Sequence, residues 1–394
     1  MWHVYLMKIP PSKSHTMRAL VFEHLSKKEC IVENILQAPE VEEFKKNLRI
    51  WWDIDTVDVR NSGLALHFYM ALASLRGKKT VVTGDASIRT LRPVAPLVEA
   101  LRSLGVKITY LESEGFAPLE IEGPLHSGSV ELDGTNSQHV SALLIALSQC
   151  EGKSTIHVKN PCEKPYVEIT LGWLNRFQAN IKNCNYETFH IPKKVTIDPF
   201  ETTIPMDFSS LAFLVAVSKI LNTELDLEKC DFSDAQGDKA LFSLLEQSEC
   251  SIEDTPDLLP VLMVLAVYGK GPTKLHKIHV ARQKESDRPF SMRTELVKMG
   301  ACIHVDEAAD WIEITPGPLK GASLFSHNDH RVAMSLAVAA IGATGPTTIE
   351  SVDCVSKSFP SFFETFCPDW AAEIGKDDFG KIVIRPKKPE FCRS

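Results

Sequence analysis

One local pattern recurs six times along the chain, and this repetition limits the possible folds more than any other feature of the sequence. Each copy opens with a short polar cluster and continues as a segment rich in Ala, Leu and Val that is apolar on nearly all sides. Such a segment predicts a helix buried inside a domain, because a helix without a polar face must be covered on every side. The six segments are residues 11–25, 61–75, 135–149, 206–220, 255–269 and 328–342.

A strand-like run follows each of these helices, and its β-branched residues and flanking Gly, Pro or Asn favour a β-strand. The runs are residues 27–35, 77–85, 152–160, 222–230, 271–279 and 345–353. An amphipathic helix is expected next, as in segments 93–105 and 290–300, where apolar residues recur every three or four positions. Both segments end in glycine, at Gly105 and Gly300, which fits a left-handed C-cap before a further strand.

The repeats predict an α/β (α+β) protein with two domains. Each domain would hold three βαβαββ-like repeat units, with parallel buried helices inside and sheets outside, as an inside-out α/β barrel. A chain of 394 residues is long enough for two such domains. We expect the N-terminal domain to span residues 11–200, and the C-terminal domain to combine residues 1–10 with residues 201–394. The N-terminal strand would then belong to the second domain.

Composition excludes several classes of protein. The net charge of −8 argues against binding nucleic acid through bulk electrostatics, so an anionic substrate would need a local cationic site. The ten cysteines form no C-x-x-C pair and no Cys/His cluster, which predicts free thiols and no metal site. No apolar stretch reaches the length of a membrane span, and the first ten residues are too short for a signal peptide. These features predict a cytoplasmic protein.

The polar clusters of the repeats all fall at expected helix N-termini, where free N–H groups and the helix dipole attract anions. Six such ends facing one cleft would form a strong anion site. Ser, Thr, Asn and Asp at these positions can equally serve as N-caps alone. That simpler interpretation does not account for the cations beside the caps, such as Lys13 and Arg18 around Ser14.

A series of motifs along nearly the whole chain resembles the EPSP synthase family, in the family's order. They are PPSKSHTMRAL from Pro10, NSG from Asn61, TGDASIRTLRP from Thr83, DGTNSQHVSALL from Asp133, EKPYVEITL from Glu163, TPD from Thr255, QKESDR from Gln283, NDHR from Asn328 and KSFPSFF from Lys357. Any one of these could occur by chance. The last three together, in order, are strongly characteristic of the family.

The resemblance implies two small-molecule substrates, shikimate 3-phosphate and phosphoenolpyruvate (PEP), and no metal or organic cofactor. The residues implied to bind shikimate 3-phosphate are Lys13, Ser14, Arg18, Asn136, Ser137, Gln138, Tyr166, Asp257 and Lys284. Those implied to bind PEP are Lys13, Gly63, Arg92, Gln138, Arg288, Arg331 and Lys357. Arg89 competes with Arg92 for its role, because the TGD-to-RP spacing is one residue longer than the family pattern.

The implied reaction is an addition followed by an elimination, which requires acid and base groups. The 5-hydroxyl of shikimate 3-phosphate adds to C2 of PEP while C3 gains a proton, and the adduct then loses phosphate and a C3 proton. The resemblance makes Asp257 the candidate to accept the hydroxyl proton. It makes Glu285 the candidate for proton transfer at C3, with Lys13 as an alternative acid. Asp257 could also be a helix N-cap beside Pro256, and the two roles can coexist.

Several positions depart from the family pattern, and they cluster in the N-terminal domain. His67 and Phe68 stand where the pattern has Arg and Pro, and Leu64 replaces a Thr beside the PEP phosphate. Asn136 replaces a Ser, a milder change that keeps hydrogen bonding. Glu163 replaces a Ser that contacts the shikimate phosphate, which a carboxylate would repel unless it is turned away or protonated.

Two other interpretations stay open. A degenerate homologue could bind a ligand without turnover, as the short interval between Lys13 and Asn61 suggests, although such a protein should also lose its cations. UDP-N-acetylglucosamine enolpyruvyl transferase shares the fold and PEP, but that family typically opens with Lys-Asn, whereas Ser14 follows Lys13 here. We also expect glyphosate to bind at the PEP site, and the protein to be a monomer that binds neither nucleic acid nor membranes.

Overall fold

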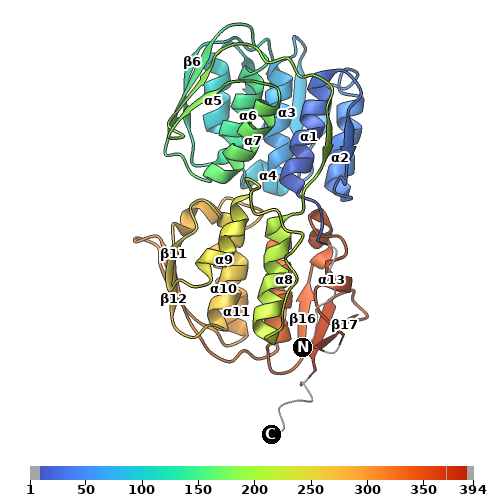
Figure 1. The fold of residues 1–394 in the computed structure, drawn as a ribbon, viewed down its shortest axis with the longest axis vertical. Coiled ribbons are helices and arrows are strands. Elements are labelled where there is room, and N and C mark those ends of the chain that lie inside the picture. The colour runs from blue at the N-terminus through green and yellow to red at the C-terminus, as the bar shows by residue number, and fades with distance from the viewer. Residues whose placement is uncertain (1–8, 370, 388–394) are drawn as a thin grey trace. The chain divides into compact units, whose positions relative to one another are not determined.

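The computed structural model describes residues 9–369 and 371–387. Its chain divides into two compact units (Figure 1). The N-terminal unit comprises Pro11–Pro205 and Ala235–Gly237, and the C-terminal unit comprises Met206–Asp234 and the described chain from Asp238 onward, together with Ile9 and Pro10. The strand expected at the N-terminus falls on residues 1–8, which lie outside the described residues.

In the N-terminal unit, three of the six predicted apolar segments form helices. They are α1 (Lys13–Ser26), α3 (Gly63–Ser74) and α6 (Ser137–Leu147). All twelve residues of α3 are buried, as expected for a helix that is apolar on every side. Four further helices accompany them: α2 (Pro39–Arg49), α4 (Ala86–Thr90), α5 (Ala95–Ser103) and α7 (Lys164–Arg176). Helix α6 packs against both α3 and α7, and Figure 1 shows these helices side by side.

The sheets of the N-terminal unit repeat one strand order. In the order β2-β3-β5-β4, strand β2 (Thr56–Asp58) is parallel to β3 (Thr80–Thr83), and β5 (Leu119–Glu122) is antiparallel to both β3 and β4 (Lys107–Tyr110). The second sheet has the same pattern, with β6 (Ser129–Asp133), β7 (Ser154–Lys159), β9 (Thr188–Ile191) and β8 (Lys182–Cys184) in that order. Repeated strand order at this level confirms the repeat units inferred from the sequence.

The first repeat is smaller than the others. In the described part of the chain, its strand β1 (Ile31–Glu33) pairs only with β10 (Glu201–Thr203), in a parallel two-stranded sheet. The antiparallel pair that completes each four-stranded sheet has no counterpart here among the described residues. The short interval between Lys13 and Asn61 in the sequence accounts for this smaller repeat.

The C-terminal unit holds the other three apolar helices, α8 (Phe208–Leu221), α10 (Leu259–Val267) and α12 (His330–Ile341). Around them lie α9 (Leu241–Leu244), α11 (Arg288–Lys298) and α13 (Phe362–Thr365), with the short 3-10 helices η1 (Gly237–Ala240), η2 (Pro256–Leu258), η3 (Ile278–Ala281) and η4 (Val352–Lys357). No described helix is both long enough and apolar enough to cross a membrane.

Two four-stranded sheets in the C-terminal unit follow the same strand order. One consists of β11 (Glu249–Ser251), β12 (Thr273–His276), β14 (Trp311–Thr315) and β13 (Cys302–Asp306). The other consists of β15 (Ser323–Phe325), β16 (Thr347–Glu350), β18 (Ile382–Pro386) and β17 (Ala372–Lys376). In both, the first two strands are parallel and the remaining pairs are antiparallel.

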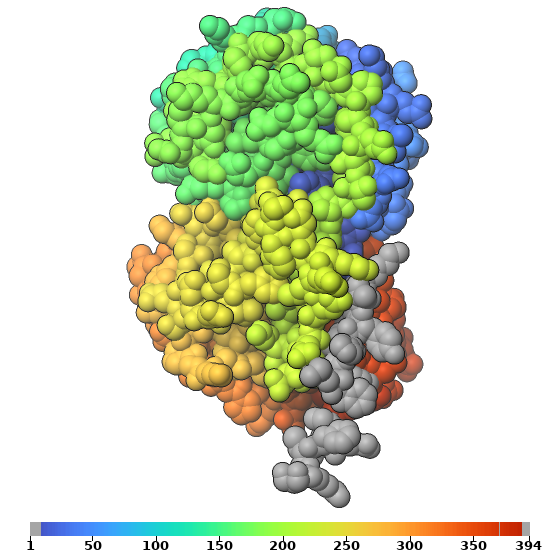
Figure 2. Space-filling model, viewed as in Figure 1, coloured from blue at the N-terminus to red at the C-terminus, as the bar shows by residue number. Residues whose placement is uncertain are grey.

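One predicted strand was wrong. Segment 222–230 contains a single bridge residue, Glu224, and no strand within the described chain. None of residues 221–234 is buried, and Figure 2 shows this yellow-green part of the chain at the surface of the C-terminal unit. By contrast, Gly105 and Gly300 both have a φ of +97°, which confirms the predicted left-handed C-caps of α5 and α11.

Candidate active site

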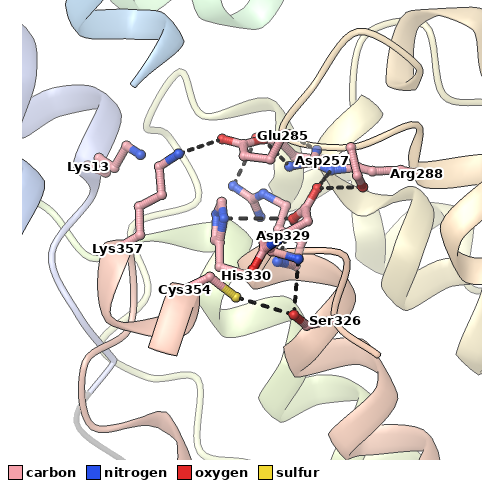
Figure 3. Close-up of polar contacts among 12 residues, drawn as sticks. Lys13, Asp257, Glu285, Arg288, Ser326, Asp329, His330, Cys354 and Lys357 are labelled. Carbon is pink, nitrogen blue, oxygen red and sulfur yellow. Dashed lines mark hydrogen bonds and ion pairs between the residues drawn. The ribbon is translucent and has the colours of Figure 1, made fainter. Parts of the chain in front are cut away.

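In the C-terminal unit, the guanidinium of Arg288 joins three carboxylates (Figure 3). Its Nη1 lies 2.5 Å from Asp257 Oδ1, its Nη2 donates to Glu285 Oε2 at 2.8 Å, and its Nε donates to Asp329 Oδ2 at 2.9 Å. Only 1% of the Arg288 side chain is exposed. Burial would lower the pKa of Arg288, but the carboxylates, led by Asp329, raise it well above its ordinary value.

Two more cations complete this network. Arg331 Nη2 lies 2.8 Å from Asp257 Oδ2, and Lys357 Nζ donates to Glu285 Oε1 at 3.1 Å. Asp257 and Glu285 are therefore each held between two cations. Burial alone would raise the pKa of Asp257, but the charges of Arg331, Arg288 and Lys284 hold it well below its usual range. Asp257 is thus ionised at neutral pH.

Helix N-termini place these side chains. Asp287 caps α11 by accepting the N–H of Phe290 at 3.1 Å, so Arg288 begins the helix. Asp329 caps α12 by accepting the N–H of Arg331 at 2.8 Å, and its other carboxylate oxygen holds Arg288. One residue therefore both starts a buried helix and orients the central cation of the network.

Asp238 belongs to the same network, and the sequence analysis missed it. Its carboxyl is buried and accepts a hydrogen bond from the Ser209 hydroxyl. Burial raises the pKa of Asp238 to about 7, and the charge of Asp257 adds to this, whereas Arg331 acts in the opposite direction. The only local signal is a Gln-Gly-Asp triplet before a short apolar run, which predicts a turn more readily than a buried acid.

The network balances its own charges. Its carboxylates are Asp238, Asp257, Glu285 and Asp329, and its cations are Lys284, Arg288, Arg331 and Lys357. Donor atoms of Glu285, Asp329 and His330 come within 4.8 Å of one another, the spacing of a metal site. Both carboxylates, however, already accept from Arg288. The arrangement therefore suits an anionic ligand, which could replace these carboxylates as the partner of the cations. It suits a metal ion less well.

In the N-terminal unit, the start of α1 carries the predicted Lys13 and Ser14. Ser12 caps this helix by accepting the N–H of His15, and Lys13 Nζ donates to Glu40 Oε2 at 3.0 Å. Glu40, at the start of α2, was not anticipated from the sequence. It lies 27 residues from Lys13, so no local pattern connects the two.

Arg18, one turn into α1, is buried between helices. Its guanidinium donates to the carbonyl oxygens of Ser14 and Tyr166 at 2.9 Å each, to Thr170 Oγ1 at 2.8 Å and to Ser141 Oγ at 3.4 Å. Burial lowers its pKa, but these oxygen acceptors satisfy the group as a cation. In this structure Arg18 fixes the positions of Ser14 and Tyr166.

Gly63, Arg92 and Gln138 converge at the N-terminus of α3. A Cβ atom on Gly63 would lie 3.1 Å from Gln138 Oε1 and 3.3 Å from Arg92 Nη1, so a side chain here would crowd both groups. Arg89 is directed elsewhere, since it donates to Glu112 Oε1 and to the carbonyl of Gly84, both at 2.8 Å. The structure thus brings Arg92, and not Arg89, to Gly63 and Gln138.

The N-terminus of α6 has an unexpected internal partner. Asn136 caps the helix by accepting the N–H of Gln138 at 2.9 Å. The backbone N–H and the hydroxyl of Ser137 both donate to Glu163 Oε2, at 3.0 and 2.6 Å. Glu163 is 1% exposed. The Glu163 carboxylate, which departs from the family pattern, therefore accepts hydrogen bonds from the Ser137 donors that are predicted to bind a phosphate.

The other N-terminal departures from the family pattern lie inside α3. Leu64, His67 and Phe68 are all buried. His67 Nδ1 is 2.6 Å from the carbonyl oxygen of Gly63, so this nitrogen carries the proton and donates. The His67 ring also packs against that of His139, with centroids 4.8 Å apart. These residues shape the helix beneath Gly63.

Comparison with known proteins identifies the family. The model of the family described as EPSP synthase (3-phosphoshikimate 1-carboxyvinyltransferase) matches residues 49–256 and 243–366, which is more than half of the chain. The chain belongs to the EPSP synthase family. A 3-phosphoshikimate 1-carboxyvinyltransferase of Chlamydia caviae is 35% identical, over 90% of this chain and 89% of the relative. Another, of Acetivibrio thermocellus, is 34% identical, over 90% of this chain and 93% of the relative.

The similarity of this chain to EPSP synthases extends to the fold. The solved structure of EPSP synthase from Acinetobacter baumannii matches with a TM-score of 0.71 at 23% identity, over 91% of this chain and 93% of that chain. At this identity the match establishes the fold alone. It confirms the predicted two-domain α/β architecture of repeated units.

Proposed function

We propose that the protein transfers the enolpyruvyl group of PEP to the 5-hydroxyl of shikimate 3-phosphate, releasing phosphate. The observation that carries this proposal is the network around Arg288, in which Asp257 and Glu285 are each held between two cations. PEP is small and carries both a carboxylate and a phosphate, so it requires several cations close to acid and base groups. Family membership supports the same reaction.

The substrate contacts follow the motifs. In the N-terminal unit we assign shikimate 3-phosphate to Lys13, Ser14, Asn136, Ser137, Gln138 and Tyr166, with Arg18 acting through Ser14 and Tyr166, which it holds. In the C-terminal unit we assign it to Asp257 and Lys284. We assign PEP to Lys13, Gly63, Arg92 and Gln138 in the N-terminal unit and to Arg288, Arg331 and Lys357 in the C-terminal unit. The packing of Gly63 against Gln138 and Arg92 supports Arg92 over Arg89.

The charge balance of the network suggests how proton transfer works. Asp257 is ionised, so it can accept the 5-hydroxyl proton as that oxygen bonds to C2 of PEP. Glu285 shares its cations, Arg288 and Lys357, with the assigned PEP site. A carboxylate that loses cationic partners to a ligand becomes easier to protonate. PEP binding would therefore favour a protonated Glu285, which gives its proton to C3, with Lys13 as the alternative acid. In the elimination, Glu285 takes a proton back from C3 as the C2–O bond to phosphate breaks and phosphate leaves.

Three further properties are part of the proposal. Glyphosate should inhibit the protein by competing with PEP, since it would meet the same cations. We expect a monomer, as the resemblance to the EPSP synthase family implies. We expect a cytoplasmic location, because the cysteines of the described residues are all free, which is typical of a reducing compartment.

The test is phosphate release with both substrates, compared with each substrate alone. Asp257→Asn and Lys357→Met should each reduce the release at least about a hundredfold, because they remove a base and a cation used in the transition state. Lys381→Met is the matched control, since Lys381 also pairs with a carboxylate, Glu350, which is not one of the carboxylates of the network. Release that requires both substrates supports the proposal. Release with PEP and UDP-N-acetylglucosamine instead, or none at all, contradicts it.

A further inference from the structure

Glu163 occupies an anion site made by another helix. It stands at the N-cap position of α7, yet its side chain does not cap that helix. Its Oε2 instead accepts both the N–H and the hydroxyl of Ser137, which is 26 residues earlier at the first position of α6. At 1% exposure, this carboxylate is fully inside the N-terminal unit.

The backbone conformation of Glu163 also indicates that its contact with Ser137 is held in place by the fold. Glu163 has a φ of +54°, in the left-handed region that residues with a side chain seldom adopt. A residue held in that conformation costs free energy, which the surrounding contacts must offset. The N-terminus of a helix offers free N–H groups and the positive end of its dipole, so a full negative charge there is stabilising. The geometry is that of a bound anion, with a side chain of the protein in the place of a ligand.

Helix α6 does not need this carboxylate as its cap. Asn136 already occupies the N-cap position and accepts the N–H of Gln138. Glu163 instead accepts hydrogen bonds from the N–H and the hydroxyl of Ser137. A phosphate bound at this helix N-terminus would use the same two donors. A phosphate and a carboxylate cannot both accept the same N–H and O–H, and two anions at this distance repel each other.

We propose that Glu163 is a specificity-determining residue, an internal anion that competes with the 3-phosphate of shikimate 3-phosphate for Ser137. The inference rests on the proposed function, because it assumes that this substrate binds at α6. Its consequence is a reduced preference for the phosphorylated ligand over shikimate itself. Binding of the phosphate requires the Glu163 carboxylate to leave Ser137, whereas shikimate, which has no phosphate, leaves that contact intact.

The experiment measures the dissociation constants of shikimate 3-phosphate and of shikimate by titration calorimetry, for the full-length protein and two variants. Glu163→Gln keeps an oxygen acceptor for Ser137 but removes the charge, and Glu163→Ser removes the competitor. We expect both variants to bind shikimate 3-phosphate more tightly, by about tenfold or more for Glu163→Ser, and to bind shikimate as before. Glu168→Gln is the matched control, because Glu168 is a hydrogen-bonded carboxylate of the same helix that contacts Tyr186 and Asn183 instead.

The results separate this inference from the proposed function. Unchanged or weaker binding of shikimate 3-phosphate in both variants, with an unchanged Tm, would mean that Glu163 does not compete with the phosphate for Ser137. If such a protein still releases phosphate with both substrates, the inference is wrong and the proposed function stands. If no variant binds shikimate 3-phosphate and phosphate release is absent, both are wrong. Should Glu163→Ser fold poorly, the nearly isosteric Glu163→Gln decides the question through the same ratio of dissociation constants.

Discussion

Asp329 Oδ2 accepts a hydrogen bond from Arg288 Nε at 2.9 Å, and the side chains of Asp329 and Arg288 are 0% and 1% exposed, respectively. A buried ion pair contributes little over an apolar pair, but removing one partner leaves the other charge uncompensated. Because Asp329 also caps α12, this single contact links the stability of a buried helix to the position of a cation in the candidate active site.

Asp329→Ala should therefore reduce the free energy of unfolding by about 3 kcal/mol, through loss of both the cap and the ion pair. Asp329→Asn keeps a capping oxygen and removes only the charge, so it should cost less. Urea unfolding of the two variants measures the difference. Equal losses in both would show that the ion pair with Arg288, and not the cap, is the important contribution.

Asp238 should make stability depend on pH. Burial raises its pKa in the folded protein to about 7, from an ordinary value near 3.8. Between these values the folded state binds more protons than the unfolded state, so the free energy of unfolding falls as pH rises through this window. Asp238→Asn removes this fall, and its stability relative to wild type should therefore increase from pH 4 to pH 7. Denaturant unfolding across that range is the measurement.

The exposed Asp378 provides the control for that experiment. Asp378→Asn should leave the pH dependence of wild type unchanged. If Asp238→Asn follows the wild-type slope as well, Asp238 does not take up a proton on folding.

Gly63→Ala should weaken PEP binding without unfolding the protein. The new methyl group would lie 3.1 Å from Gln138 Oε1 and 3.3 Å from Arg92 Nη1, so both side chains must move. We expect KM for PEP to rise roughly tenfold or more, because displacing a binding group by a fraction of an ångström is costly in a positioned site. Gly172→Ala is the control. A Cβ there meets nothing within 4 Å, and alanine inside a helix should be neutral or stabilising.

Arg92 and Arg89 offer a matched pair of substitutions. Arg92→Lys loses the planar fork beside Gly63 and should lower kcat/KM for PEP roughly tenfold or more. Arg89→Lys alters contacts with Gly84 and Glu112 and should leave kcat/KM for PEP unchanged. Steady-state kinetics with varied PEP distinguishes the two. A larger effect of Arg89→Lys would reverse the assignment.

The sequence predicted the buried helices well because a segment without a polar face has few alternatives in water. α3 and α12, both buried at every position, are examples. The resemblance of three motifs to the EPSP synthase family also located the residues around Arg288. The contacts of Lys13 with Glu40 and of Ser137 with Glu163 were not predictable, since they join positions 27 and 26 residues apart that no local pattern relates.

The strand predicted for segment 222–230 was wrong for a different reason. The β-branched Thr223 and the flanking Asn222 favour a strand locally, but no residue of this segment is buried in the described structure. Such local preferences produce a strand only where a neighbouring strand and a core face are available. Likewise, the burial of Asp238 depends on Ser209 and on packing that a Gln-Gly-Asp triplet does not specify.

The pairing of β1 with β10 has a consequence for synthesis on the ribosome. Ile31 pairs with Glu201, so the first strand of the N-terminal unit waits for a partner made 170 residues later. At translation rates of about 5–20 residues per second, that wait is on the order of ten seconds or longer. During this time the exposed edge of β1 is open to wrong partners. We expect the nascent N-terminal unit to need chaperone protection until Thr203 has left the exit tunnel.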